Sequence, residues 1–256
     1  MENIFDTHAH YDDEAFNEDR EELLGLLPNE GVSHVITCGT NLMSSYRSLK
    51  LSEKFDYIYC ALGFHPEDIA DERKGDLDTI KEMLSSNKKA VAVGEIGLDY
   101  HYDDGAPREE QIDLFRRQIE MANELSLPII VHDRDAHEDT FNIVKEMNPK
   151  GVIHCFSGSA EMAKEYIKLG MYIGVGGVVT FKNARKAVEV VEAIPLERIL
   201  LETDCPYMAP TPFRGQRNDS SLISFVAEKI AEIKGVEPQE VIDVTNANAK
   251  KLFNIE

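Results

Sequence analysis

Short apolar runs alternate with longer amphipathic stretches from one end of the chain to the other. The short runs are rich in β-branched residues and nearly continuous in apolar character, which is typical of parallel strands covered on both faces. The longer stretches place apolar residues at helical spacing, as Ile112, Phe115 and Ile119 do within 107–125. In that stretch Pro107 suits a first helical turn, and Glu109 suits the helix dipole. The pattern therefore predicts alternating strands and helices.

Eight strands are expected, and helices fill most of the gaps between them. The predicted strands are 3–8, 34–39, 57–63, 90–96, 128–132, 151–155, 171–175 and 198–203. The predicted helices are 16–27, 42–54, 76–86, 107–125, 137–147, 160–169, 184–193, 220–234 and 238–252.

Strand–helix alternation of this kind predicts right-handed βαβ units and a parallel sheet. Eight units in 256 residues match the size of a single (β/α)8 TIM-type barrel, with a doubly wound sheet as the second choice. The chain has no internal repeat, low-complexity tract or Gly/Ser linker, so residues 1–256 are expected to form a single domain.

Composition narrows the classes of function. The formal net charge is −20, which argues against broad, non-specific binding to a phosphate backbone. It leaves a phosphate substrate open, because divalent cations in a pocket would reverse the local sign of charge. The four cysteines are scattered, and no apolar run is long enough to span a membrane. We therefore expect a cytoplasmic protein that needs no membrane and no obligate protein partner.

The first predicted strand leads into a histidine pair with one residue between, His8 and His10. Residues i and i+2 of a strand point to the same face, so both imidazoles can aim at one point. Imidazole is a common ligand for divalent transition metals. Taken alone, the pair is weak evidence, and it favours a metal only slightly over two ordinary polar residues leaving a strand.

Four further polar residues stand at the ends of other predicted strands: Glu95, His132, His154 and Asp204. In a barrel the carboxyl ends of all strands meet at one mouth, where active sites of this fold lie. Six such residues at one end favour a metal site over six unrelated hydrogen-bonded side chains.

Six ligands exceed what one tetrahedral ion takes and suit two divalent ions about 3.5–4 Å apart. Glu95 is the candidate bridge, because its two oxygens can each reach one cation. His8, His10 and Asp204 would complete one site, and His132 and His154 the other. Histidines suit Zn²⁺ and Mn²⁺, whereas carboxylates with open water positions also admit Mg²⁺.

Several motifs together resemble the TatD family of metal-dependent deoxyribonucleases, in family order and over residues 4–253. They are Phe5-Asp6-Thr7-His8-Ala9-His10, Gly63-Phe64-His65-Pro66, Gly94-Glu95-Ile96-Gly97-Leu98-Asp99-Tyr100, His154-Cys155-Phe156-Ser157-Gly158, Leu201-Glu202-Thr203-Asp204-Cys205-Pro206, Arg214-Gly215-Gln216-Arg217-Asn218 and the closing 246–253. The resemblance implies a metal-dependent hydrolase barrel that cleaves phosphodiester bonds of DNA, as a 3′–5′ exonuclease. One departure is visible: Asp219-Ser220 follows Asn218, where the family usually continues to an acidic residue and proline.

Within this reading, three residues carry predicted catalytic roles. Asp204 is the best-placed general base, since a carboxylate at the metal can take a proton from water. Glu202, two residues earlier, would orient water or a ligand histidine, although a structural ion pair explains it equally well. His65 would contact the scissile phosphate or donate to the leaving group.

Three arginines near these segments are candidates for binding the substrate: Arg134, Arg214 and Arg217. Guanidinium groups offer bidentate contacts to phosphate, yet surface ion pairs of arginine are just as ordinary. Two other functions stay open, namely hydrolysis of an amide, lactone or ester by the same site, and a non-catalytic binding protein. The complete ligand set argues against the second of these.

Overall fold

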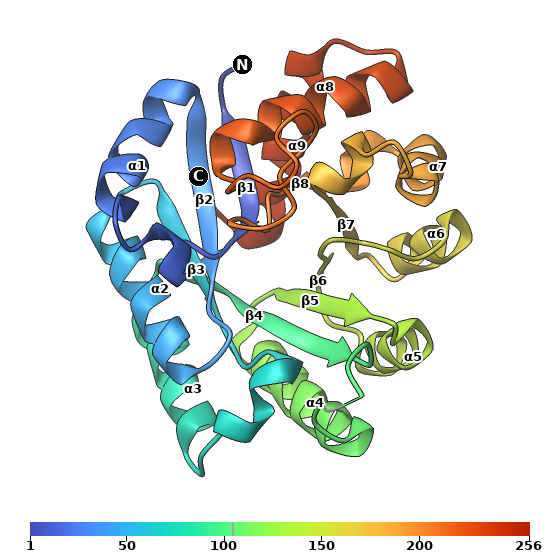
Figure 1. Ribbon diagram of the computed structural model, residues 1–256. Helices are drawn as coiled ribbons and strands as arrows, with labels where there is room; N and C mark the ends of the chain where they lie inside the picture. The colour runs from blue at the N-terminus through green and yellow to red at the C-terminus, as the bar shows by residue number, and fades with distance from the viewer. Residues whose placement is uncertain (104) are drawn as a thin grey trace.

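The apolar runs form a barrel of eight parallel strands in a computed structural model, which describes residues 1–103 and 105–256 (Figure 1). The strands follow one another around the barrel in chain order, and every pair of neighbours is parallel. Their bounds are β1 (Ile4–Ala9), β2 (Val32–Cys38), β3 (Ile58–Leu62), β4 (Ala90–Asp99), β5 (Ile129–Arg134), β6 (Gly151–Ile153), β7 (Tyr172–Val175) and β8 (Ile199–Leu201). The predicted (β/α)8 fold is therefore confirmed.

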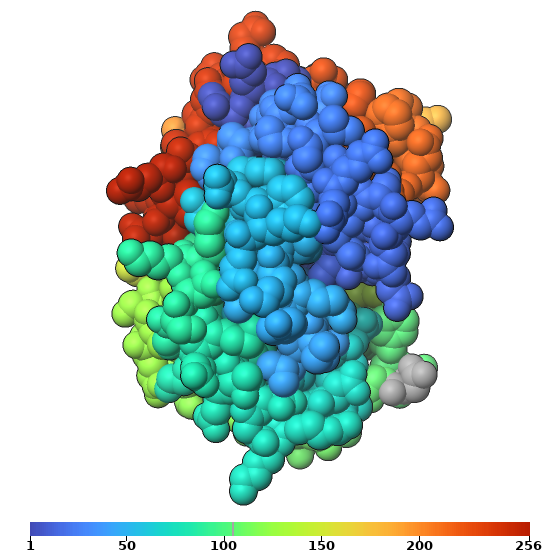
Figure 2. Space-filling view, turned by 90° about the vertical axis from the view of Figure 1, so that its left-hand side faces the viewer, coloured from blue at the N-terminus to red at the C-terminus, as the bar shows by residue number. Residues whose placement is uncertain are grey.

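Helices between the strands cover the outside of the barrel. They are α1 (Arg20–Leu26), α2 (Leu42–Lys54), α3 (Asp76–Ser86), α4 (Arg108–Leu125), α5 (His137–Met147), α6 (Ala160–Lys168), α7 (Arg185–Ala193), α8 (Ile223–Lys234) and α9 (Pro238–Phe253). Seen from the side of α1, α2 and α3, the side chains form a continuous outer wall (Figure 2). In the part of the chain that the structure describes, no helix is both long and apolar enough to cross a membrane.

Local sequence explains where several helices begin. α2 begins after Asn41, whose side-chain oxygen accepts a hydrogen bond from the Ser44 amide at 2.9 Å, as an N-cap does. α6 begins in the same way after Ser159. Pro107 precedes α4 as its N-cap instead of opening its first turn, a small correction to the predicted start.

The helix expected over 16–27 is shorter than predicted. Residues Glu14–Phe16 form a separate 3₁₀ turn, α1 begins at Arg20, and a second 3₁₀ turn follows at Leu27–Glu30. Most of the difference lies in the start of the helix, four residues later than predicted. At the other end Pro28 limits the helix, because proline has no backbone N–H to continue the helical hydrogen bonds. In the same way, the helix expected from 220 begins with a 3₁₀ turn and becomes α8 at Ile223.

The barrel interior is packed with apolar side chains, and every strand contributes at least one of them to a single buried cluster. The strand residues of the cluster are Phe5, Ile36, Cys38, Ala61, Val91, Ala92, Ile130, Val152, Tyr172 and Leu200, and Phe253 of α9 joins them. A larger cluster fills the layer between the sheet and the helices. Because the interior is a solid core, polar chemistry is confined to the barrel ends.

The barrel closes at a seam between β8 and β1. Beyond the end of β8, the amide of His10 donates to the carbonyl of Cys205 at 2.8 Å, and the amide of Asp204 donates to the carbonyl of His8 at 2.9 Å. Thr7 adds a side-chain hydrogen bond to the carbonyl of Leu201 at 2.9 Å. The seam excludes an open doubly wound sheet, and it holds Asp204 beside the histidine pair.

Candidate metal centre

Six side chains come together at the carboxyl ends of the strands, as the sequence predicted. His8, Glu95 and His132 lie in β1, β4 and β5, while His10, His154 and Asp204 lie just beyond β1, β6 and β8. Most of them are buried, and Asp204 and His132 keep limited access to solvent. Buried ionisable groups need partners or a bound ion, because desolvation of a charge is costly.

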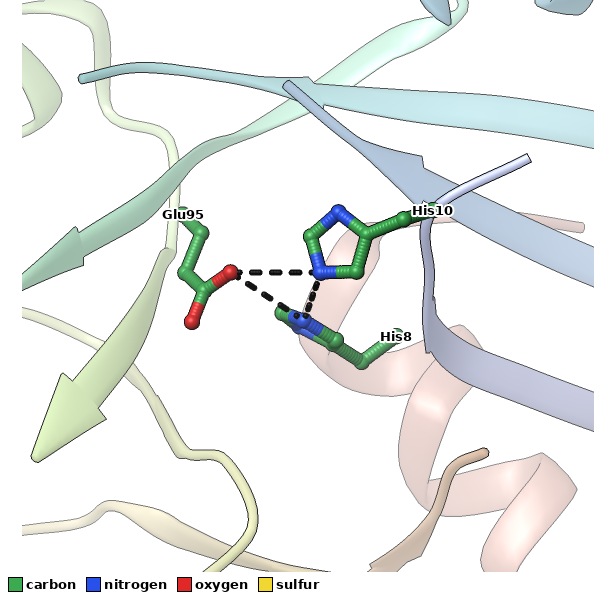
Figure 3. A group of neighbouring side chains, drawn as sticks. All are labelled: His8, His10 and Glu95. Atoms are coloured by element: carbon green, nitrogen blue, oxygen red, sulfur yellow. Dashed lines mark hydrogen bonds and ion pairs between the residues drawn. The ribbon is translucent and has the colours of Figure 1, made fainter. Parts of the chain in front are cut away.

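The first group joins the histidine pair to Glu95 (Figure 3). The Nε2 atoms of His8 and His10 are 3.0 Å apart, and they lie 3.4 and 3.3 Å from Oε2 of Glu95. Oδ1 of Asp204 lies 3.6 Å from the His8 nitrogen and 3.5 Å from the His10 nitrogen. Each of these two carboxylate oxygens thus lies close to both imidazole nitrogens.

These spacings fit a metal ion. Ligand atoms about 2.0–2.2 Å from a tetrahedral ion are roughly 3.3–3.6 Å from one another. The five distances that join the His8 and His10 nitrogens to each other, to Glu95 and to Asp204 run from 3.0 to 3.6 Å. The donor set, two imidazoles and two carboxylates, suits a divalent transition metal.

A second group surrounds the other oxygen of Glu95. Oε1 lies 2.7 Å from Nε2 of His154 and 2.9 Å from Nδ1 of His132, and these two nitrogens are 3.4 Å apart. Nε2 of His65 lies 3.6 Å from the same oxygen. The two oxygens of Glu95 therefore face different nitrogen groups, which is the geometry that a bridging carboxylate requires.

Outer contacts fix the orientation of the histidines. Nε2 of His132 lies 2.9 Å from Oδ2 of Asp99, which leaves Nδ1 facing Glu95. Cys38 contacts both members of the histidine pair. Its carbonyl accepts a hydrogen bond from Nδ1 of His10 at 3.1 Å, and its Sγ lies 3.4 Å from Nδ1 of His8. Such contacts hold the ligating nitrogens toward an ion.

Glu202 lies behind this centre in a fully buried position. One of its oxygens accepts a hydrogen bond from the amide of Cys155, and the other has no hydrogen-bond partner among the residues that the structure describes. Burial raises the pKa of Glu202 to about 8. No ion pair with lysine or arginine is found for Glu202 within residues 1–103 and 105–256, so the predicted alternative of a structural ion pair gains no support.

The charge states of Glu95, His8 and His132 bear on how the centre would bind cations. Burial alone raises the pKa of Glu95, but the imidazoles around it, chiefly His154 and His8, outweigh burial and hold the pKa well below its usual range. Burial lowers the pKa of His8 to about 4, so this imidazole is neutral near pH 7. Burial opposes the charged form of His132 as well, yet its contacts with Asp99 and Glu95 raise its pKa to about 10. A cation must therefore displace a proton from His132.

The centre opens into a cavity of about 970 Å³, a volume in the range of small-ligand sites. Acidic residues dominate its lining, and three arginines stand among them, Arg20, Arg47 and Arg134. Arg20 is occupied by backbone carbonyls and Asn17, and Arg47 contacts Asp12 at 3.2 Å. The cavity therefore favours anions only when cations offset its carboxylates.

The three arginines predicted to bind the substrate lie in different surroundings. Arg134 lines the cavity and donates to the hydroxyl of Tyr102 at 3.2 Å. Arg217 forms an ion pair with Asp19, and the guanidinium of Arg214 stacks 4.1 Å from the ring of Phe181. Neither is among the described residues that line the cavity, so a substrate role for either stays a prediction.

Two residues that hold the centre together escaped the sequence analysis. Asp6 accepts hydrogen bonds from Thr203 and Ser220, both at 2.6 Å, and so ties β1 to the segment after β8. A signal for Asp6 exists, because it is a carboxylate beside the histidine pair and directly follows the apolar Ile4 and Phe5. Cys38 carried no such signal, since its contacts join strands that are neighbours only in the fold.

Comparison with known proteins places these features in a wider group. A family model described as TatD related DNase matches residues 5–254. The chain is 47% identical to YabD of Bacillus subtilis, described as an uncharacterised metal-dependent hydrolase, over 98% of this chain and 99% of that one. It is 34% identical to YcfH of Escherichia coli, which carries the same description, over 99% of this chain and 96% of that one.

Solved structures agree with the barrel architecture. The crystal structure of YjjV, a TatD homologue from Escherichia coli, superposes with a TM-score of 0.90 at 34% identity and covers 99% of both chains. An organophosphorus hydrolase variant from Deinococcus radiodurans superposes with a TM-score of 0.68 at 17% identity, over 98% of this chain and 92% of that one. The second likeness concerns the fold alone.

Proposed function

This chain belongs to the TatD family of metal-dependent hydrolases, and from that premise we propose that it is a deoxyribonuclease that removes nucleotides from the 3′ end of DNA. The observation that carries the proposal is the arrangement around Glu95, whose two oxygens face two separate groups of nitrogen ligands. A pair of divalent cations, when bound, would neutralise the phosphate oxygens, acidify a water molecule and stabilise the leaving oxygen. Phosphodiester hydrolysis needs all three effects.

Asp204 is suited to receive the proton of the attacking water. Its side chain is 20% exposed and lines the cavity, while Oδ1 faces the histidine pair. Although burial raises its pKa, the contacts with His10 and His154 lower it below the usual value, so the group is an ionised acceptor near neutral pH.

His65 is suited to donate a hydrogen bond to the phosphate. Its Nδ1 accepts from the amide of Glu67 at 3.2 Å, so the neutral ring carries its hydrogen on Nε2. Burial lowers the pKa of His65 to about 3, which keeps the ring neutral near pH 7. A neutral Nε2–H at the cavity wall supports contact with a phosphate oxygen rather than proton transfer to the leaving group.

One assay tests the proposal. The protein is stripped of metal, reloaded with Mg²⁺, Mn²⁺ or Zn²⁺, and given single-stranded DNA labelled at either end. We expect metal-dependent loss of label from the 3′ end first. Asp204→Asn protein purified in the same way controls for contaminating nucleases, and we expect its activity to fall at least about 100-fold.

Other outcomes distinguish the alternatives. Turnover of esters, lactones or amides without DNA cleavage would favour a different substrate at the same site, because an activated water attacks carbonyl carbon as well as phosphorus. Silence on all substrates, with no bound metal by elemental analysis, would favour a non-catalytic binding protein. A cytoplasmic location and the absence of an obligate partner stay predictions.

A further inference from the structure

Three large, mainly apolar side chains are exposed at the mouth of the cavity. Side chains of this kind are usually buried unless they contact a ligand or another protein. Tyr207 is 56% exposed, Tyr102 is 49% exposed and Met208 is 43% exposed, and all three line the cavity. Exposed apolar side chains gathered at a cleft mark a surface that contacts a ligand. The rest of the lining is mostly polar or charged, so these side chains are out of keeping with it.

The two tyrosines stand on opposite sides of the metal centre. Tyr102 follows β4 and Tyr207 follows the end of β8, and the strand order places β4 and β8 across the barrel from each other. The same two strands supply Glu95 and lead to Asp204, so the tyrosines flank the ligands on both sides. A chain that crosses the mouth over the metal centre would meet one ring before it and one ring after it.

Both rings are held in place by contacts of their own. The guanidinium of Arg134 lies 5.1 Å from the centre of the Tyr102 ring and donates to its hydroxyl. Tyr207 donates its hydroxyl to Asp13 at 3.1 Å, and its amide donates to the carbonyl of Asp204 at 2.9 Å. Fixed rings lose little conformational entropy when a ligand stacks on them, which favours binding.

We propose that Tyr102 and Tyr207 stack on unpaired bases on the two sides of the phosphate held at the metal centre. The proposal rests on the proposed function and deepens it, because it names residues that select single-stranded DNA. Base–aromatic stacking tolerates any sequence, since every base has a π-face. Bases in a duplex present those faces to their neighbours, so a paired end must open before it binds.

The test compares DNA with bases to DNA without them. Tyr102→Ala and Tyr207→Ala proteins are assayed on a single-stranded oligonucleotide and on a matched one whose last four nucleotides are abasic tetrahydrofuran residues. We expect each substitution to raise KM on the base-containing strand about tenfold and to leave KM on the abasic strand unchanged. Tyr207→Phe keeps the ring and should retain nearly all of the wild-type affinity.

A matched control is available on the outside of the barrel. Tyr46 in α2 is 49% exposed, the same value as Tyr102, but it is not among the described residues that line the cavity. Tyr46→Ala should therefore change KM on neither strand. Circular dichroism of each variant checks that the barrel is intact.

The possible outcomes distinguish the stacking role from the nuclease activity on which it rests. An equal rise in KM on both strands, or an unchanged KM on both, would overturn the stacking role while leaving the nuclease activity standing. Failure of the wild-type protein to cleave either strand with any metal would overturn the proposed function, and the stacking role with it.

Discussion

At the scale of single residues, Glu95 determines the geometry of the centre. Oε2 lies within 3.4 Å of both members of the histidine pair, and Oε1 lies within 2.9 Å of His132 and His154. The buried carboxylate can satisfy both groups at once only if it stays ionised, and the surrounding imidazoles keep its pKa low despite burial. The site therefore depends on charge balance as much as on shape.

Cys38 offers a residue-scale prediction about the histidine pair. Cys38→Ala removes the Sγ contact with Nδ1 of His8, so we expect metal affinity to fall about tenfold. Competition with a chelator measures the affinity. Cys60→Ala is the matched control, because Cys60 is equally buried but contacts Ser52 and Lys89 instead of a ligand. Equal affinities in the two variants would rule out this role for Cys38.

How far the site could be predicted is also a matter of single residues. His8, His10, Glu95 and His154 could be found because a polar residue that ends an apolar strand is unusual in sequence. Cys38 could not, because its contacts with His8 and His10 span 30 and 28 residues and exist only once β1 and β2 pair. Whether the six ligands bind two ions is still a prediction.

At the scale of elements, short strands make room for large polar groups at the carboxyl end. β6 ends at Ile153 and β8 at Leu201, before His154 and Glu202, so these residues belong to the loops above the core. β7 contributes Gly174, where a Cβ would come within 2.8 Å of the Glu202 carboxyl carbon. A glycine in this strand leaves the space that the Glu202 side chain fills.

The element-scale prediction concerns that space. Gly174→Ala should displace Glu202 and lower kcat at least about tenfold while the barrel still folds. Gly25→Ala in α1 is the control, because nothing lies within 4 Å of an added Cβ there. Alanine in a helix should leave activity intact and stabilise the protein by about 0.5–1 kcal/mol. Full activity of the Gly174 variant would show that the placement of Glu202 is unimportant.

Element boundaries were predictable where local chemistry defines them. The bounds of α2, α3 and α5 match the predicted 42–54, 76–86 and 137–147. Asn41 caps α2, whereas α3 and α5 have no side-chain cap and follow from their apolar periodicity and acidic first turns. β4 extends beyond the predicted end at 96 to Asp99, since pairing with β5 continues to Arg134. That extension depends on the partner strand, which sequence periodicity alone does not reveal.

At the scale of the whole molecule, the metal centre joins strands from all around the barrel. Its proposed ligands come from β1, β4 and β5 and from the segments after β6 and β8, so bound ions would bridge the seam between β8 and β1. The net charge of −20 should increase the stabilisation by bound cations, because clustered carboxylates repel one another until cations neutralise them.

Removal of metal should therefore lower thermal stability. Ions present at about 100 times their Kd stabilise a folded protein by about 2.7 kcal/mol. For a chain of this size that corresponds to a rise in Tm of roughly 5–10 °C, which calorimetry with and without a chelator would measure. Replacing His10 with Ala should shrink the rise. A Tm that is indifferent to chelator and metal would contradict a structural contribution of the ions.

The most direct test of the two-ion centre bridged by Glu95 is the count of ions per chain. Elemental analysis of Mn²⁺-loaded protein, combined with electron paramagnetic resonance, should give two ions per chain with a coupled-pair spectrum. Glu95→Gln should lose occupancy at both positions and the coupling with it, whereas Glu67→Gln, on the same cavity wall, should keep both. A single uncoupled ion in the wild-type protein, or two coupled ions in the Glu95 variant, would contradict the account.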